Sequence, residues 1–219
     1  YDNQQGDMFD EQELLRVNAF DWEAEFAPVF DQGGFDAVIG NPPWIDIKGM
    51  NQQDVEYFFS QYKTTQNRMN IYATFLHKGV HITKAKGYLG FITPNSFYTQ
   101  SSYSLLRNFL LEKSSPITIV RMPDNTFKKV TAESTITIFT MQRQSTAEVH
   151  IFKDDIKISF MDFDKALYNK EIDIDFWRNE PNNIFNIFVS ESESRLLKKL
   201  ENNSYPLIDI CEFCLGVTP

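Results

Sequence analysis

The residues Asn41-Pro42-Pro43-Trp44 have the composition of a site that grips a planar amine. The exocyclic amine of adenine is a poor nucleophile, because its lone pair is delocalised into the ring. Two acceptors placed against its hydrogens favour a pyramidal nitrogen whose lone pair points at a methyl donor. The Asn41 side-chain oxygen supplies one acceptor and the Pro42 carbonyl the other, and two prolines stiffen that carbonyl in advance. Trp44 offers a flat face on which an extruded base stacks.

A simpler interpretation of the same four residues is a rigid turn. Proline fixes its own φ and restricts the residue before it, so Pro42 and Pro43 end a strand abruptly. The string is nevertheless uncommon by composition, because proline makes up only about 5% of residues in proteins. In either interpretation the four residues come directly after a strand.

The elements around these residues alternate strand and helix. Residues 35–40 form a short apolar run after the Gly33-Gly34 turn, as in a buried parallel strand. The pattern then predicts helices over 52–62, 70–85 and 101–113, and strands over 88–93, 117–122 and 134–142. Gly87 is expected to end the second of these helices. This order predicts an α/β fold, with a mostly parallel sheet wrapped by helices.

Periodicity weakens beyond residue 143. We expect a hairpin of 149–152 with 156–160, a short helix over 163–168, a linker over 173–183 and an amphipathic helix over 191–200.

The overall composition is that of a globular protein. The chain has 219 residues, of which 42% are hydrophobic and 20 are Phe. No apolar run approaches the roughly 18 residues of a membrane span, and the first ten residues lack a signal-peptide pattern. We therefore expect a cytoplasmic protein with no membrane partner, and the 2 Cys fit a reducing compartment.

Charge is distributed unevenly along the chain. Residues 1–43 hold 1 basic and 10 acidic residues, residues 44–143 hold 12 and 6, and residues 144–219 hold 8 and 14. The basic middle part favours an anionic partner such as double-stranded DNA. An unevenly charged, solvated surface would give the same count.

Several segments resemble a known family. The string Phe35-Asp-Ala-Val-Ile-Gly-Asn-Pro-Pro-Trp44 resembles motif IV of the TaqI-like bacterial DNA adenine methyltransferases, a branch that includes type II restriction-modification and phage-defence methylases. Further similarity lies in segments 18–26, 70–75, 87–97, 127–142 and 204–218. The resemblance covers nearly the whole chain, and this ordered set is more specific than any single motif.

The resemblance implies roles for individual residues. Asn41, Pro42, Pro43 and Trp44 match the catalytic motif, although the family usually has Tyr in place of Trp44. Phe127 matches an aromatic on the other side of the flipped base, with ordinary core packing as the alternative.

Other residues are assigned to the cofactor and to DNA. Asn18 and Phe20, together with Asn41, match positions expected to touch the cofactor, while a polar turn with a buried Phe is an equal alternative. Tyr72 is expected either to line the base pocket or to pack within its helix. We expect basic residues to face DNA phosphates, namely Lys48, Lys63, Arg68, Lys128 and Lys129.

One expected motif is absent from the sequence. The family holds the methionine part of S-adenosylmethionine with a glycine-rich loop, and no Phe-x-Gly-x-Gly string occurs in the chain. We therefore expect an incomplete Rossmann-like methyltransferase sheet, whose missing N-terminal half lies on the same polypeptide before residue 1. The expected divisions are an acidic lead-in (1–34), the C-terminal part of the catalytic domain (35–143), a connecting region (144–203) and the start of a target-recognition domain (204–219).

Together these features predict part of a site-specific DNA adenine methyltransferase of a restriction-modification enzyme. The reaction would transfer a methyl group from S-adenosylmethionine to the exocyclic amine of a flipped adenine, and we expect residues 1–219 alone to be inactive. One alternative is methylation of a protein glutamine or another nucleic-acid amine, because Asn-Pro-Pro-aromatic presents acceptors to any planar amide or amine. Another is a non-catalytic DNA-binding fragment.

The remaining reactive residues predict no metal site. Cys211-x-x-Cys214 has no second pair with which to bind zinc. His77 and His81 lie at i, i+4 of a predicted helix without the Glu of a metalloprotease motif, so we interpret them as structural.

Overall fold

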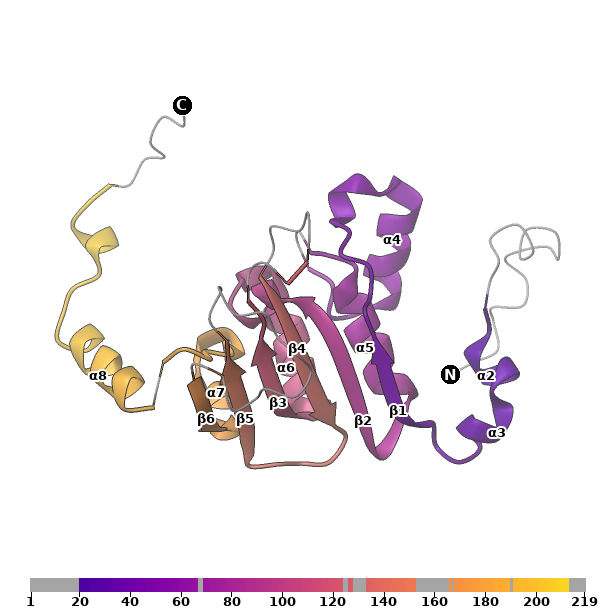
Figure 1. Cartoon of the computed structure of the whole chain (residues 1–219). Coiled ribbons are helices and arrows are strands. Elements are labelled where there is room, and N and C mark those ends of the chain that lie inside the picture. Colours follow the sequence, from indigo (N-terminus) through magenta and orange to yellow (C-terminus); the bar gives the residue numbers. More distant parts are fainter. Residues whose placement is uncertain are drawn as a thin grey trace.

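A computed structural model describes residues 20–66, 69–123, 126–127, 133–152, 166, 168–189 and 191–212. These residues form a six-stranded sheet in the order β1-β2-β4-β3-β5-β6, with helices packed against it (Figure 1). The strands are β1 (Phe35–Gly40), β2 (Thr83–Pro94), β3 (Ser115–Arg121), β4 (Ser134–Thr140), β5 (Thr146–Ile151) and β6 (Tyr168–Asp173). The helices are α2 (Trp22–Glu25), α3 (Ala27–Phe30), α4 (Gln52–Gln61), α5 (Tyr72–Ile82), α6 (Ser104–Lys113), α7 (Ile174–Asn179) and α8 (Glu191–Glu201). Short 3-10 turns are η1 (Ile47–Gly49), η2 (Asn95–Tyr98), η3 (Ser101–Tyr103), η5 (Pro181–Asn183) and η6 (Leu207–Asp209).

The strands β1, β2, β3 and β5 run in one direction. The expected α/β fold is confirmed, but the prediction of a mostly parallel sheet is wrong: β4 lies between β2 and β3 and runs against both, and β6 runs against β5. Because β4 returns directly beside β3, the strand that precedes it, the pair is antiparallel, as is usual for such a connection. The carboxyl ends of β1, β2 and β3 therefore meet the start of β4 at one edge of the sheet.

Helices α5 and α6 cover one face of the sheet (Figure 1). Leu76 of α5 and Leu106 and Leu110 of α6 are buried in the core. Gly79 allows the close approach of α5 to β2, since a Cβ there would lie 2.8 Å from Leu89 Cδ1. Phe75, on the outward side of α5, is exposed.

Helix α5 ends earlier than the sequence predicts. It stops at Ile82, and β2 begins at Thr83, which pairs with Phe35 of β1. The predicted helix stop at Gly87 is wrong, because Gly87 lies within β2. A Cβ on Gly87 would come within 2.9 Å of the Asp36 carbonyl, so the residue is needed for close strand contact.

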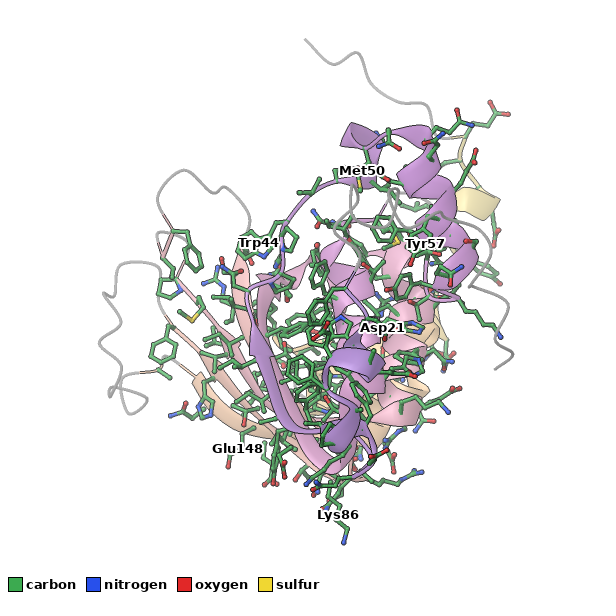
Figure 2. All side chains as sticks on the ribbon, turned by 90° about the vertical axis from the view of Figure 1, so that its right-hand side faces the viewer. Asp21, Trp44, Met50, Tyr57, Lys86 and Glu148 are labelled. Atoms are coloured by element: carbon green, nitrogen blue, oxygen red, sulfur yellow. The ribbon has the colours of Figure 1, made fainter. Side chains whose placement is uncertain are left out.

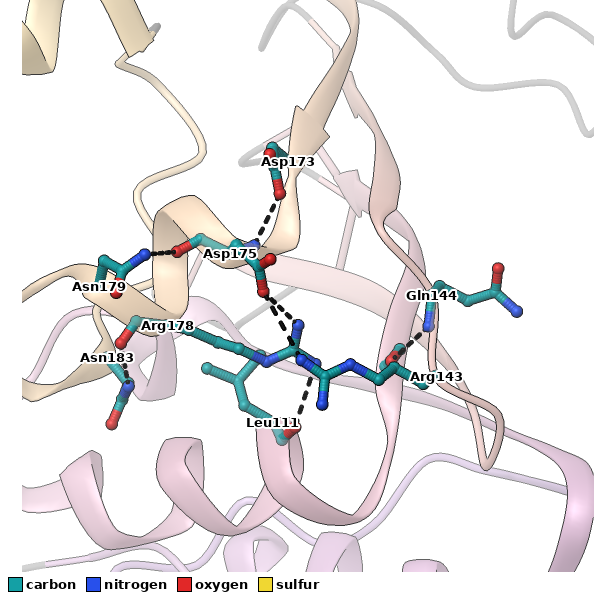
Figure 3. A network of polar contacts seen from close by, with 9 residues as sticks. Leu111, Arg143, Gln144, Asp173, Asp175, Arg178, Asn179 and Asn183 are labelled. Atoms are coloured by element: carbon teal, nitrogen blue, oxygen red, sulfur yellow. Dashed lines mark hydrogen bonds and ion pairs between the residues drawn. The ribbon is translucent and has the colours of Figure 1, made fainter.

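The linker predicted over 173–183 is wrong. These residues form α7 and η5, and the side chains of Ile174 and Trp177 are fully buried. Figure 3 shows a polar network that fixes α7: Asp175 accepts a hydrogen bond from Arg178 at 2.7 Å, and Arg178 Nη2 donates to the Leu111 carbonyl at 3.3 Å. Non-local burial thus overrides the loop-like composition of this segment.

Strand β5 pairs with β6 and extends the sheet beyond residue 143. The predicted hairpin partner at 156–160 lies outside the described residues, as does most of the helix predicted over 163–168, whose last residue, Tyr168, begins β6. Helix α8 is confirmed where residues 191–200 predicted it. The domain boundaries at 34, 143 and 203 stay predictions. Within the described part of the chain, no helix is both long and apolar enough to cross a membrane.

Replacing Trp177 with Ala should lower the free energy of unfolding by about 3–5 kcal/mol. The indole is 0% exposed and stacks on Phe185 with ring centroids 5.0 Å apart. Urea denaturation followed by circular dichroism measures the change. Phe188→Ala is the matched control, because Phe188 is 56% exposed, and it should cost less than about 0.5 kcal/mol. Equal losses in the two variants would contradict the packing of α7.

Candidate active site at the carboxyl edge of the sheet

Asn41 to Trp44 leave the sheet at the carboxyl end of β1. Figure 2 shows Trp44 at this end and Lys86 at the opposite end. Pro42 is buried, whereas Asn41 is exposed and its side chain makes no hydrogen bond with the described residues. The Asn41 amide is therefore free to accept a hydrogen bond from a ligand.

Backbone pairing holds this loop on both sides. Upstream, Gly40 pairs with Phe91 of β2, and a Cβ on Gly40 would lie 3.2 Å from that ring. Downstream, the Ile71 amide donates to the Ile45 carbonyl at 2.9 Å, and the Ile47 amide donates to the Met69 carbonyl at 3.1 Å. The loop is thus fixed between β1 and the start of α5, which limits the directions that Asn41 can take.

Trp44 and Phe127, 83 positions apart in sequence, lie side by side. Their ring centroids are 5.8 Å apart and their planes are at 88°, an edge-to-face contact. Both rings are half-buried, and the Trp44 Nε1 atom is buried with no hydrogen-bond partner among the described residues. The structure thus brings together the two aromatics predicted to hold a base. Rings in mutual contact must move apart before a base can lie between them.

A polar cluster at the carboxyl end of β2 was missed by sequence reasoning. Asn95 Nδ2 donates to Glu133 Oε2 at 2.6 Å, and the Asn95 amide donates to the Glu133 carbonyl at 2.9 Å. Arg121 Nη2 lies 3.7 Å from Glu133 Oε1. The sequence signal for this cluster is weak, namely an Asn that follows Pro94 at the end of a strand. The Asn95–Glu133 contact forms because β2 and β4 are neighbours in the sheet, which the local sequence does not show.

Tyr72 belongs to the core rather than to an open pocket. Its hydroxyl lies 2.9 Å from Ser96 Oγ, and its ring stacks on Tyr103 at 5.7 Å. Burial raises the pKa of Tyr72 well above its usual value. Of the two alternatives, the structure supports packing: Tyr72 lies in the core and contacts η2 through Ser96.

A family model for the Eco57I restriction-modification methylases matches residues 1–127. The chain belongs to this family. The type II restriction enzyme and methyltransferase RM.Eco57I of Escherichia coli is 25% identical over 199 residues, which cover 86% of this chain and 19% of that protein. The adenine-specific methyltransferase BrxX of Escherichia coli O9:H4 (strain HS) is 28% identical over 115 residues, 50% of this chain and 9% of that protein. The chain therefore spans less than a fifth of either relative.

Solved structures of restriction-modification enzymes share this fold. The type IIG restriction endonuclease BpuSI matches with a TM-score of 0.55 and 15% identity, covering 80% of this chain and 23% of that chain. A nuclease-deletion mutant of the type ISP enzyme LlaGI matches with a TM-score of 0.51 and 15% identity, covering 85% and 21%. The predicted Rossmann-like methyltransferase fold is confirmed for this member of the Eco57I family.

Of the other residues singled out from the family resemblance, Phe20, Lys48 and Lys63 lie within the described part of the chain. Phe20 packs on Trp22, which contacts Phe35 at the amino end of β1, so Phe20 lies at the opposite end of that strand from Asn41. Lys48 and Lys63 are exposed. The remaining candidates lie outside the described residues: Asn18, Arg68, Lys128 and Lys129.

His77 and His81 pack between α5 and α6 in this Eco57I-family chain. Their Nε2 atoms are 3.0 Å apart, and His77 Nδ1 lies 2.8 Å from Thr64 Oγ1. The His77 ring stacks on Phe109 at 4.2 Å. Burial, with a smaller contribution from His81, lowers the pKa of His77 to about 4. No group of three or more His, Cys, Asp or Glu among the described residues could hold a metal; Cys211 is exposed and Cys214 lies outside them.

Stability should fall as the pH decreases from about 6.5 to about 4. His77 has a lower pKa in the folded state than in the unfolded state, so the unfolded state takes up the proton first in this range. Between pH 7 and pH 4 the wild type should lose on the order of 2 kcal/mol more unfolding free energy than His77→Gln. Urea denaturation at each pH measures both proteins, and identical pH dependences would contradict the assignment.

Proposed function

We propose that this chain forms the target-base side of a DNA adenine methyltransferase in a restriction-modification enzyme. The reaction is methyl transfer from S-adenosylmethionine to the exocyclic amine of a flipped adenine. The observation that carries this proposal is the free, exposed Asn41 side chain, held at the carboxyl end of β1 beside the Trp44–Phe127 pair. Ligands of open α/β sheets bind at this end of the strands.

Asn41 and Pro42 activate the amine by accepting hydrogen bonds from its two N–H groups. The Asn41 side-chain oxygen takes one hydrogen bond and the Pro42 carbonyl takes the other, so the nitrogen becomes pyramidal and its lone pair is released from the ring. The nitrogen then attacks the methyl carbon, the carbon–sulfur bond breaks with its electron pair left on sulfur, and the amine loses one proton to water. Because the loop is fixed before the base arrives, little reorganisation is needed in the transition state.

Trp44 and Phe127 hold the adenine ring once it has left the duplex. Extrusion removes the base from its stack, and stacking on aromatic side chains compensates for part of that loss. Trp44 extends directly from the catalytic loop, so the position of the ring and the position of the amine are set by one short segment.

The cofactor requires residues beyond those described near Asn41. S-adenosylmethionine supplies an electrophilic methyl group on its sulfonium. The exposed Asn41 amide fits a place beside it, whereas Phe20 lies at the other end of β1. In our proposal a glycine-rich loop elsewhere in a longer polypeptide holds its methionine part. The small share of each relative that the chain covers supports this. So does β1, which pairs only with β2 among the described residues and whose Ile39 is 90% exposed.

The proposed partner is double-stranded DNA, and the proposed compartment in which the protein binds it is the cytoplasm. The excess of 12 basic over 6 acidic residues in 44–143 supports contact with phosphates. Lys48 and Lys63 are the described members of the proposed phosphate-binding set, which also includes Arg68, Lys128 and Lys129.

In the full-length protein, Asn41→Ala should reduce the rate of methyl transfer by about a hundredfold or more, because it removes an acceptor used mainly in the transition state. Transfer of tritium-labelled methyl groups to DNA measures the rate, and DNA affinity should change little. Asn108→Ala, an exposed substitution on α6, is the control and should leave the rate unchanged. A wild-type rate in Asn41→Ala would rule out the proposed mechanism, and labelling of a protein instead of DNA would rule out the proposed substrate.

Replacing both Lys48 and Lys63 with Ala should weaken DNA binding and reduce its salt dependence. The slope of log affinity against log salt concentration should fall by about one for each phosphate contact removed. Fluorescence anisotropy of a labelled duplex across a salt series measures it. Lys86→Asn is the control: Lys86 lies at the opposite end of the sheet from Trp44 and has φ of 70°, which Asn tolerates (Figure 2). An unchanged slope in the double variant would show that neither lysine contacts DNA phosphates.

A further inference from the structure

A buried arginine ties the corner after β2 to the segment after α7. Arg107, on α6, is 0% exposed. Its Nη1 donates hydrogen bonds to the carbonyls of Phe97 at 2.8 Å and Gln100 at 2.7 Å, and its Nε donates to the Asn182 carbonyl at 3.0 Å. The guanidinium forms no ion pair with the described residues, and its Nη2 has no hydrogen-bond partner among them.

Stability alone explains this arrangement poorly. A buried cation without a counter-charge is costly, and an apolar side chain of similar size commonly fills such a place at least as well. Burial lowers the pKa of Arg107 to about 10, so the side chain remains protonated near pH 7. The Phe97 carbonyl belongs to η2, and the Gln100 carbonyl, which precedes η3, also accepts a hydrogen bond from the Tyr103 amide at 3.2 Å.

The segment after α7 is shaped to meet this corner, which comprises residues 95–100. Asn182 and Asn183 have φ of 56° and 52°, a left-handed turn that directs the Asn182 carbonyl to Arg107. Three residues on, the Phe185 amide donates to the Tyr98 carbonyl at 2.9 Å, and the two rings stack with centroids 5.8 Å apart. Two separate contacts therefore join this segment to the corner.

The same corner begins at the carboxyl end of β2. Its first residue, Asn95, binds Glu133, and Ser96 contacts the Tyr72 hydroxyl. Because β1 and β2 are adjacent and parallel, with Gly40 opposite Phe91, the corner lies at the same edge of the sheet as Asn41. A shift of the corner would change the surroundings of the candidate site without touching Asn41 itself.

We propose that Arg107 is a positioning residue, which holds the corner at the catalytic edge by bracing it against residues 182–185. The inference rests on the proposed methyl transfer. Arg107 and the corner lie within residues 1–127, the part matched by the family model, whereas residues 182–185 lie beyond it. Arg107 touches no proposed substrate group, so its effect on the reaction is indirect.

Hydrogen exchange tests the brace without reference to activity. Arg107→Lys keeps the charge, but its single nitrogen replaces a fork that reaches carbonyls on two segments. In the full-length protein, mass spectrometry should show exchange at least about tenfold faster in peptides covering 95–100 and 182–187. Arg178→Lys is the matched control, since Arg178 binds Asp175 and the Leu111 carbonyl, and it should leave residues 95–100 unchanged. Wild-type exchange in Arg107→Lys would overturn the proposal.

Methyl-transfer kinetics test the positioning role. For Arg107→Lys, kcat per folded molecule should fall about tenfold or more, while KM for DNA and for S-adenosylmethionine changes less than twofold. Asn182→Val, which disfavours positive φ in an exposed turn, should give the same split and serves if Arg107→Lys fails to fold. An unchanged kcat despite faster exchange would overturn the positioning role. Absence of DNA methylation by the wild type would instead refute the proposed function. The hydrogen-exchange experiment would still test whether Arg107 braces the corner.

Discussion

The fixed backbone of the loop after β1 is the constraint on which the candidate site depends. An amide oxygen stabilises a transition state only if its direction is set before the substrate arrives. Here the backbone that carries the amide is held by pairing with β2 on one side, by hydrogen bonds to Met69 and Ile71 on the other, and by two prolines between. The rest of the sheet supports this loop, because it places the start of α5 and the end of β2 beside it.

Packing behind the sheet edge follows a consistent arrangement. Tyr72 from α5 contacts Ser96 of η2, Tyr98 of η2 is hydrogen-bonded to Thr135 and Thr137 of β4, and Phe185 from the segment after α7 stacks on Tyr98. Both tyrosine hydroxyls have a partner, as buried Tyr usually requires. The end of the sheet that carries the candidate site is therefore backed by residues far apart in the sequence, including one from a segment after residue 173.

Local patterns predicted much of the fold and of the candidate site. The burial expected for the strand at 35–40 is wrong, since no residue of β1 is buried and Ile39 is 90% exposed. The strand itself could be recognised from its apolar run, the helices at 52–62 and 101–113 from their sequence patterns, and Asn41-Pro42-Pro43-Trp44 because proline has few conformational options. The end of α5 and the burial of Trp177 could not, since both depend on partners distant in sequence: Phe35 pairs with Thr83, and Phe185 stacks on Trp177. The Asn95–Glu133 contact was hidden for the same reason, because it requires the antiparallel β4.

Strand β1 has a further consequence for how the chain behaves in solution. Within the described residues it pairs only with β2, so its outer row of amides and carbonyls is unpaired, and Ile39 projects from it 90% exposed. Apolar edge strands of this kind recruit other strands and promote aggregation unless they are covered. Without a segment that covers β1, these residues would be prone to self-association. The solubility of the chain would then depend on whether this one strand is covered.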